Sequence, residues 1–305
     1  MSSSDFYQRL SKGRNGDSPE LSDCIQGVVS QLIANPTDTQ HPGMLLGKIQ
    51  SGKTRGFLGI IAAAFDNDFD VAIVLTKGTK TLSNQTVARF KKDFSEFIEE
   101  DSVALFDIMQ MPRKLTLSER KRKLIFVAKK QVQNLKRILK LFGETYPDLS
   151  QKRVLLVDDE ADIASIRFVK NKETDEYDQG RIAAQMDELR RLVNQLAFLQ
   201  VTATPYSLYL QPENYVQNNG EYVFLPKRPA FTSLLPIHDA YVGGTDYFGM
   251  FEESDPRSYL YVEVSNEEQE TLRSIDGRSV RGVIEFSRIL KSRSSDSPLL
   301  PLLQR

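Results

Sequence analysis

Cysteine and histidine are scarce in this sequence of 305 residues, which has one cysteine, Cys24, and two histidines, His41 and His238. One thiol cannot form an internal disulfide, and on the apolar face of a helix it is typical of a small core residue. Residues so few and so scattered cannot assemble a zinc cluster or a histidine-rich nuclease site. Disulfide scaffolds and such metal sites are therefore excluded, and a reducing, cytoplasmic compartment is expected.

Long apolar segments are also lacking. No stretch has the roughly 18 consecutive apolar residues of a membrane helix, and residues 1–16 are polar rather than signal-like. The formal net charge is −1, so the chain as a whole is not a polycation. With 40% hydrophobic and 27% charged residues, the sequence predicts a globular protein with a core and without a membrane partner.

Short apolar runs alternate with stretches that have helical spacing. The expected helices are 19–34, which ends at Asn35-Pro36, then 57–65, 134–142 with Gly143 as its C-terminal cap, and 181–196. The expected buried strands are 44–46, 71–75, 124–127, 154–157 and 197–201. This alternation predicts an α/β fold with a doubly wound, mainly parallel sheet.

The composition divides the chain into four parts. We expect an N-terminal helical segment over 1–40, an α/β lobe over 41–210, an accessory region over 211–290, and a tail or truncation point over 291–305. After Pro205 the alternation stops, although 222–225 and 258–264 resemble strands. The polar stretch 171–180 is expected to be a loop.

The segment Gly47-Lys-Ile-Gln-Ser-Gly-Lys-Thr54 matches the phosphate-binding pattern G-x-x-x-x-G-K-T, between an apolar strand and a helical run. Its two glycines let the backbone turn so that N–H groups point at a phosphate, and the next helix adds its positive end. Lys53 is expected to reach the β- and γ-phosphates and Thr54 to bind Mg²⁺. The expected residues of this ATP–Mg²⁺ site are Gly47, Gln50, Ser51, Gly52, Lys53 and Thr54.

A second motif, Val154-Leu-Leu-Val-Asp-Asp-Glu-Ala-Asp162, places carboxylates directly after an apolar strand, at the end where an open α/β sheet has its ligand crevice. Asp159 is expected to hold Mg²⁺, and Glu160 to orient and deprotonate the attacking water. Asp158 leaves the register ambiguous by one residue, and the string Asp-Glu-Ala-Asp favours Asp159. The alternative is an acidic N-cap of a following helix.

A third motif, Val201-Thr-Ala-Thr-Pro205, ends the next expected strand. Its two small hydroxyls, on Thr202 and Thr204, can hydrogen-bond the carboxylates of the second motif. Alone the motif is a weak signal, but its position after the carboxylates makes it informative.

The order of these motifs resembles motifs I, II and III of superfamily 2 helicases and restriction-enzyme motors. The stretch 75–85 lies where that family has motif Ia, a loop that contacts the nucleic-acid backbone. More narrowly, the motifs and the stretch 235–249 resemble the Z-one domain of restriction-like bacterial proteins.

The resemblance covers about residues 40–250 and implies that 41–210 is a RecA-like, ATP-hydrolysing lobe of a DNA motor in restriction or anti-phage defence. DNA is favoured over RNA as the partner. The catalytic residues would be Lys53, Asp159 and Glu160. Nucleic-acid contact or coupling would fall to Thr76, Lys77, Lys80, Thr202 and Thr204.

Some expected parts of such a motor are not recognised in the sequence. These motors close ATP between two RecA-like lobes, and the second lobe supplies an arginine finger. Little chain follows Leu290, so we expect the finger to come from further sequence or a partner subunit, and hydrolysis by these residues alone to be weak. The stretch 263–265, Glu-Val-Ser, lacks the lysine of an E-x-K nuclease site.

Positive charge is concentrated between Arg113 and Lys140, with eleven Lys/Arg and one acid, Glu119, after an acidic segment at 93–107. This separation predicts a basic face that could follow phosphates together with the loop 76–80. The alternative is an ordinary solvated surface of helix and loop.

Two other functions would use the same loop. A nucleotide-gated binding or regulatory module would switch on ATP without moving along DNA, and the absence of a second lobe favours it. A kinase or GTPase would share the phosphate-binding loop, but the Asp-Glu-Ala-Asp and Thr-Ala-Thr motifs weaken that interpretation.

Overall fold

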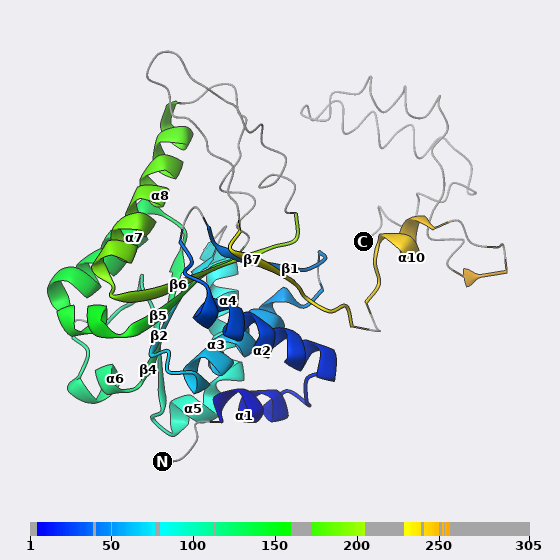
Figure 1. The fold of residues 1–305 in the computed structure, drawn as a ribbon, viewed down its shortest axis with the longest axis horizontal. Helices are drawn as coiled ribbons and strands as arrows, with labels where there is room; N and C mark the ends of the chain where they lie inside the picture. The colour runs from blue at the N-terminus through cyan, green and yellow to red at the C-terminus, as the bar shows by residue number, and fades with distance from the viewer. Residues whose placement is uncertain are drawn as a thin grey trace. The chain divides into compact units, whose positions relative to one another are not determined.

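The computed structural model describes residues 5–38, 41–49, 51–76, 80–112, 114–159, 173–204, 229–238, 241–249, 252 and 254–256. The chain divides into two compact units, Met1–His238 and Asp239–Arg305. The first unit contains a sheet with its helices, and the described part of the second contains the short helix α10 (Gly244–Phe248) (Figure 1).

A seven-stranded, all-parallel sheet in the order β3-β4-β2-β5-β6-β1-β7 is the centre of the first unit. The strands are β1 (Gly43–Leu46), β2 (Val71–Thr76), β3 (Val103–Asp107), β4 (Lys123–Lys129), β5 (Arg153–Asp159), β6 (Gln195–Thr202) and β7 (Phe231–Leu234). All five expected strands are confirmed as β1, β2, β4, β5 and β6. Because every strand is parallel, all carboxyl ends share one edge of the sheet.

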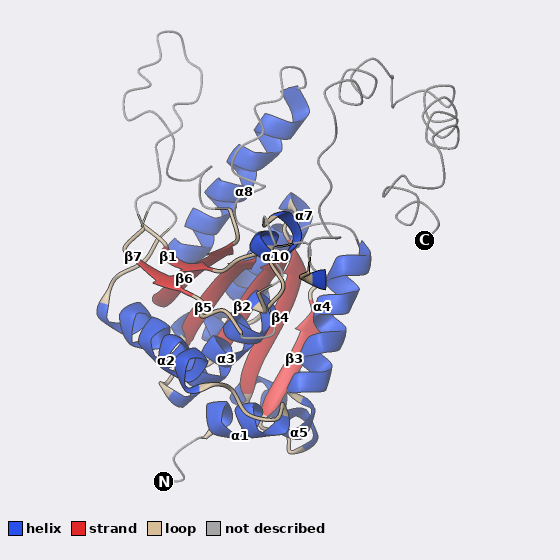
Figure 2. Ribbon diagram, turned by 90° about the vertical axis from the view of Figure 1, so that its right-hand side faces the viewer, coloured by secondary structure: helices blue, strands red, loops and turns tan. Residues whose placement is uncertain are grey.

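Helices cover both faces of the sheet (Figure 2). The first face carries α1 (Phe6–Gly13), α2 (Pro19–Ala34), α3 (Lys53–Asp66), α4 (Lys80–Asp93) and α5 (Ser95–Glu99). The second face carries α7 (Val132–Lys140), a π-helical turn at Leu141–Thr145, a 3₁₀ turn at Pro147–Gln151, and α8 (Glu173–Leu192). A short helix, α6 (Leu117–Lys121), precedes β4. The doubly wound, parallel α/β arrangement predicted from the sequence is therefore present.

The side chains of each strand divide between two hydrophobic layers. On β2, Val74 lies in the layer under α3 and Ile73 in the layer under α7 and α8. On β5, Val157 and Leu156 divide in the same way. Burying one such side chain contributes about 1.5–3 kcal/mol, so the two layers fix the position of every strand end.

Several boundaries differ from those expected. The expected loop at 171–180 is wrong over its described residues, because α8 begins at Glu173. Acidic residues in the first turn of a helix suit its positive end. The expected helix 181–196 ends earlier, at Leu192, and Leu196 belongs to β6. Gly143 is not a cap but part of the π-helical turn. The stretches 222–225, 258–264 and 291–305 lie outside the described residues.

Segments from both ends of the first unit join the central lobe. Tyr7 of α1 and Ile25 of α2 are buried in the same layer as α3. Cys24 is half-buried against this layer, as expected of a small core residue, and burial raises the pKa of its thiol. β7, from the stretch interpreted as an accessory region, pairs with β1. Within the described ranges, no helix has the length and apolar character needed to cross a membrane.

Candidate nucleotide-binding site

The loop after β1 folds back tightly on itself. The Gly47 N–H donates to the carbonyl of Thr202 at 3.1 Å, and the Ser51 N–H donates to the carbonyl of Lys48 at 3.1 Å. A Cβ atom at Gly47 would lie 2.8 Å from both Lys53 Cγ and Ser51 Oγ. A side chain at Gly47 would therefore fill the space that the loop encloses, which explains the first glycine of the motif.

The loop ends at Gly52, whose φ of 85° lies in the left-handed region. Gly52 is the N-cap of α3 and has no side chain to accept from the first-turn N–H groups. The positive end of α3 thus adjoins the loop without a side-chain cap. Lys53 Nζ donates to the carbonyl of Lys48 at 2.9 Å, so its ammonium group lies across the loop, and Thr54 is half-buried in the first turn.

The hydroxyl of Ser51 is buried without a hydrogen-bond partner. An unsatisfied buried hydroxyl costs about 1–3 kcal/mol, and each case calls for an explanation. A phosphate oxygen in the loop would accept from this hydroxyl and from the N–H groups of the α3 first turn. The glycine cradle, the orphaned hydroxyl and the uncapped helix therefore fit a phosphate group.

Two adjacent aspartates end β5 and lie on opposite faces of the sheet. Val157 packs in the layer under α3 and Leu156 under α7 and α8, so by alternation Asp159 lies on the α3 face and Asp158 on the other. The loop 47–54, the candidate P-loop, leads into α3, so Asp159 lies on the same face of the sheet as the helix that follows this loop. Of the two aspartates, Asp159 therefore lies on the face where the Mg²⁺ residue is expected from the sequence.

Asp158 has a partner of its own on the second face. Its Oδ2 accepts from Lys130 Nζ at 2.7 Å, and the side chains are 1% and 8% exposed, respectively. Its Oδ1 is buried without a partner, as is Oε1 of Gln200, the residue opposite Asp158 in β6. Asp158 is therefore a buried structural carboxylate.

The third motif lies between the first two. β6 pairs with β1 on one side, where Leu46 is opposite Thr202, and with β5 on the other, where Asp159 is opposite Val201. Thr202 is fully buried, and its Oγ1 accepts from the Thr204 N–H at 3.1 Å. The three motifs thus end three adjacent strands at one edge of the sheet.

The residues expected to contact nucleic acid have different environments. Thr76 ends β2 with 2% exposure, and its hydroxyl is buried without a partner. The side chains of Thr76 and Thr202 are thus both buried at the ends of their strands. Lys80 begins α4, while Gln50, Lys77 and Glu160 lie outside the described residues.

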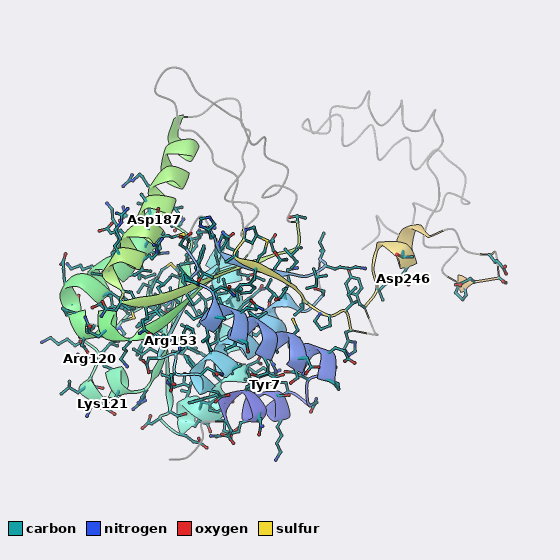
Figure 3. All side chains as sticks on the ribbon, viewed as in Figure 1. Tyr7, Arg120, Lys121, Arg153, Asp187 and Asp246 are labelled. Carbon is teal, nitrogen blue, oxygen red and sulfur yellow. The ribbon has the colours of Figure 1, made fainter. Side chains whose placement is uncertain are left out.

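The basic stretch does not form one face, contrary to expectation. The helix α6 and the residues that lead from it into β4 lie at the amino edge of the sheet, away from the candidate P-loop, and Figure 3 shows Arg120 and Lys121 together there. Much of the charge of the basic stretch is paired: Arg120 with Asp148, Arg122 with Asp101, Lys123 with Asp70, and Lys130 with Asp158. Lys129 ends β4 at the carboxyl edge and Lys130 follows it, so these two lysines lie at the edge of the sheet that carries the motifs.

The sequence analysis misses side chains that support the loop from other segments. Leu235, just after β7, is buried against the loop, since a Cβ atom at Gly47 would lie 3.2 Å and one at Gly56 2.6 Å from its methyl carbons. Its N–H donates to the carbonyl of Leu46 at 2.7 Å. Gly56 and Gly59, three apart on α3, are a sequence signal for such close packing.

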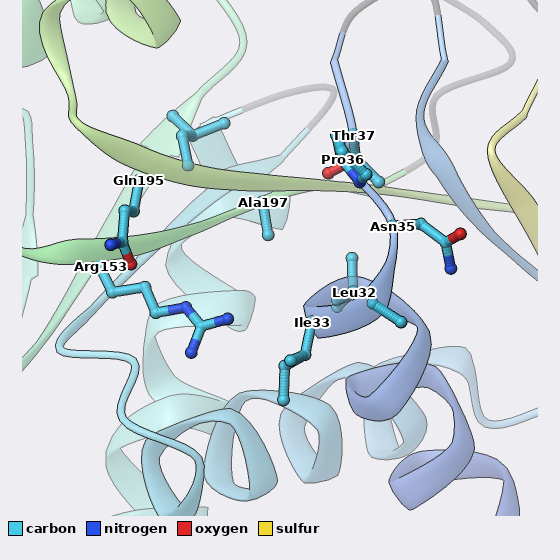
Figure 4. A pocket seen from close by; sticks show the side chains of 10 residues that line it. Leu32, Ile33, Asn35, Pro36, Thr37, Arg153, Gln195 and Ala197 are labelled. Carbon is cyan, nitrogen blue, oxygen red and sulfur yellow. The ribbon is translucent and has the colours of Figure 1, made fainter.

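A cavity of about 310 Å³ lies at the opposite edge of the sheet (Figure 4). The end of α2, with Ile33 and Asn35, forms one side, and Arg153 and Gln195, the first residues of β5 and β6, form another. Arg153 already stacks on Phe69 at 4.3 Å from the ring centre. This cavity is separate from the P-loop and has no part in the nucleotide site.

Comparison with known proteins does not assign a family. No family model matches the sequence, and no curated protein matches it. Among solved structures, the chain is similar to the C-terminal domain of a possible DNA helicase from Lactobacillus plantarum WCFS1. The TM-score is 0.29 and the identity 9%, covering 61% of this chain and 86% of that chain. This similarity is too low to carry a functional assignment, which depends on the site itself.

Proposed function

We propose that the first unit is a RecA-like lobe that binds and hydrolyses ATP, as part of a superfamily 2 DNA motor. One observation carries the proposal: the three motifs end the adjacent strands β1, β6 and β5, and the Gly47 N–H bonds the Thr202 carbonyl. Open α/β sheets bind ligands at this edge. The role in restriction or defence is part of the proposal and rests on the motif resemblance.

The loop holds the phosphates in this proposal. The N-terminus of α3 and the Ser51 hydroxyl bind phosphate oxygens, and Lys53 leaves the Lys48 carbonyl to neutralise the β- and γ-phosphates. Mg²⁺, when bound, would neutralise part of the charge of these phosphates. Thr54 and Asp159 are the residues that would hold it. In the described segments, no group of three or more His, Cys, Asp or Glu could bind a metal ion without further ligands.

The residues at the end of β5 activate the attacking water in this proposal. Glu160 follows Asp159 directly, and in this proposal it orients the attacking water and accepts its proton. Thr202 is the residue through which a change at the phosphates reaches neighbouring strands, because its carbonyl accepts from Gly47 and its strand pairs with β5. The loop 76–80, at the same edge, is the proposed contact to nucleic acid.

A nucleotide-gated regulatory module is the second candidate. The burial of Thr76 and Thr202 favours it, because these residues can transmit a change inside the lobe but cannot touch DNA. The two candidates differ in whether DNA stimulates hydrolysis.

The test is calorimetric titration of the chain with ATP–Mg²⁺, followed by hydrolysis assays with and without DNA. We expect binding that Lys53→Ala abolishes and that Lys121→Ala, at the amino edge, leaves unchanged. Glu160→Gln should keep binding and lower hydrolysis by a factor of about 10²–10⁴, the usual contribution of a general base. Absence of binding by the unaltered chain contradicts the proposal, whereas hydrolysis that DNA does not stimulate favours the regulatory module.

A further inference from the structure

A buried ionic cluster adjoins the first turn of α3. The Asp17 carboxylate, whose side chain is 1% exposed, accepts from Arg14 Nη2 at 2.6 Å and from Arg55 Nε at 2.6 Å. The Tyr7 hydroxyl donates to the same carboxylate at 3.2 Å. Burial, with Asp17 nearby, raises the pKa of Tyr7, so the phenol remains a donor. Three donors thus converge on one buried carboxylate.

These contacts hold the backbone of α3 as well as its side chain. Arg14 Nη1 donates to the Arg55 carbonyl at 3.0 Å, and Arg55 Nη2 donates in return to the carbonyls of Arg14 and Gly16. Arg55 directly follows Lys53 and Thr54 in the sequence. The cluster therefore fixes the turn that presents the two proposed phosphate and magnesium residues.

The other end of α3 is attached to the same N-terminal helix. The Asp66 carboxylate accepts from the backbone N–H groups of Phe6 at 2.8 Å and Tyr7 at 2.9 Å, which caps α1. Close approach depends on Gly59, where a Cβ atom would lie 2.5 Å from Ile25 Cδ1 and 3.3 Å from Arg14 Nη2. We call α1 together with the loop 14–18 the N-terminal hairpin. It contacts α3 at both ends of that helix.

We propose that Arg14, Asp17 and Arg55 form a clamp that positions the first turn of α3 for nucleotide binding, so that the N-terminal hairpin and the nucleotide site are energetically coupled. The proposal deepens the proposed function and rests on it. Buried ion pairs add little net stability compared with apolar packing, but the guanidinium forks fix direction, which suits positioning. Because coupling is reciprocal, nucleotide binding must also stabilise the hairpin.

The test compares two arginines: Arg55, which contacts the N-terminal hairpin from α3, and Arg9, which belongs to the hairpin. Arg55→Gln removes one side of the clamp and leaves Asp17 paired with Arg14. The matched control is Arg9→Gln, since Arg9 binds Glu96 of α5 and Glu100, the C-cap of α5, on the exposed side of α1, away from the α3 first turn. Arg55→Lys keeps the positive charge but loses the several donors of the guanidinium group. The measurements are the ATP–Mg²⁺ dissociation constant, the melting temperature, and amide hydrogen exchange of residues 56–59.

We expect Arg55→Gln to raise the dissociation constant on the order of tenfold, equivalent to about 1.4 kcal/mol, with Arg55→Lys between it and the unaltered chain. Arg9→Gln should change the dissociation constant less than about twofold, even if it shifts the melting temperature as much as Arg55→Gln does. In the unaltered chain, ATP–Mg²⁺ should slow exchange in residues 6–17. Equal loss of affinity in Arg55→Gln and Arg9→Gln overturns the clamp.

Amide hydrogen exchange measured without nucleotide tests the clamp independently of the proposed function. Amides 56–59, which bond to the carbonyls of the α3 first turn, should exchange faster in Arg55→Gln and in Asp17→Asn than in Arg9→Gln. If Asp17→Asn does not fold, the comparison of Arg55→Gln with Arg9→Gln decides. If the unaltered chain binds no ATP, the proposed function fails and this exchange still judges the positioning. Equal exchange in Arg55→Gln and Arg9→Gln means that the clamp positions nothing.

Discussion

Asp158 and Asp159 are adjacent in sequence, yet the two faces of the sheet give them different environments. Asp158 is buried under α7 and α8 and bonded to Lys130, whereas Asp159 is half-exposed on the face of the P-loop helix. The residue types are identical, so the difference comes entirely from the alternation of a strand. Position on a face, rather than chemical type, separates a structural carboxylate from a proposed metal ligand.

The largest expected effect comes from removing the buried ion pair on the second face of the sheet. Lys130→Met leaves Asp158 buried and unpaired, which should lower the free energy of unfolding by about 3–5 kcal/mol. Urea denaturation followed by circular dichroism measures this change. Lys129→Met, at the half-exposed neighbouring residue, is the matched control and should cost less than about 1 kcal/mol, as surface pairs do. Comparable losses in the two variants would mean that the buried pair has no special role.

The next effect concerns the first face. Asp159→Asn should lower the unfolding free energy less than Asp158→Asn does, and it should remove the stabilisation by ATP–Mg²⁺, which is about 2.7 kcal/mol at a hundred times the dissociation constant. Thermal melting with and without nucleotide measures it. Asp158→Asn should give the reverse pattern, with a lower melting temperature and a retained response to nucleotide. If Asp158→Asn loses that response and Asp159→Asn keeps it, the assignment of faces is wrong.

A smaller effect tests how tightly the first face is packed around the loop. Gly56→Ala places a Cβ atom 2.6 Å from a methyl carbon of Leu235, and relieving this overlap should cost about 1–3 kcal/mol. Because a leucine methyl can move, we expect the lower end of that range. The double variant Gly56→Ala with Leu235→Ala should cost less than the sum of the single changes, measured by urea denaturation. Additive costs would show that the two sites do not touch.

The smallest effect contrasts the two edges of the sheet. Lys77→Ala with Lys80→Ala should weaken DNA binding and reduce the slope of log affinity against log salt by about 0.7–0.9 for each phosphate that is no longer neutralised. Lys114→Ala with Lys121→Ala removes the same charge at the amino edge and should leave the slope unchanged. Fluorescence anisotropy over a range of salt concentrations measures both. Equal slopes in the two double variants contradict a track at the P-loop edge.

The elements that the sequence predicts are those with a local signal. The five expected strands are compact apolar runs buried on both faces, and α2 has an N-cap serine, a proline at its first turn and an Asn-Pro stop. β3 and β7 lack this signal because both are edge strands, and β7 alternates between half-buried and exposed residues. Edge strands need fewer apolar side chains, so their pattern resembles that of loops.

The sequence alone determined the order of the motifs, the strands that carry them and the residue types of a phosphate-binding loop, because apolar runs, glycines and hydroxyls act over a few neighbouring positions. Only the tertiary structure decided that Asp158 pairs with Lys130, that Thr76 and Thr202 are buried, and that Asp17 joins Arg55 across 38 residues. It also divided the basic stretch between two edges of the sheet. These facts depend on strand order and on which segments pack together, and such long-range contacts leave no periodic trace in the chain.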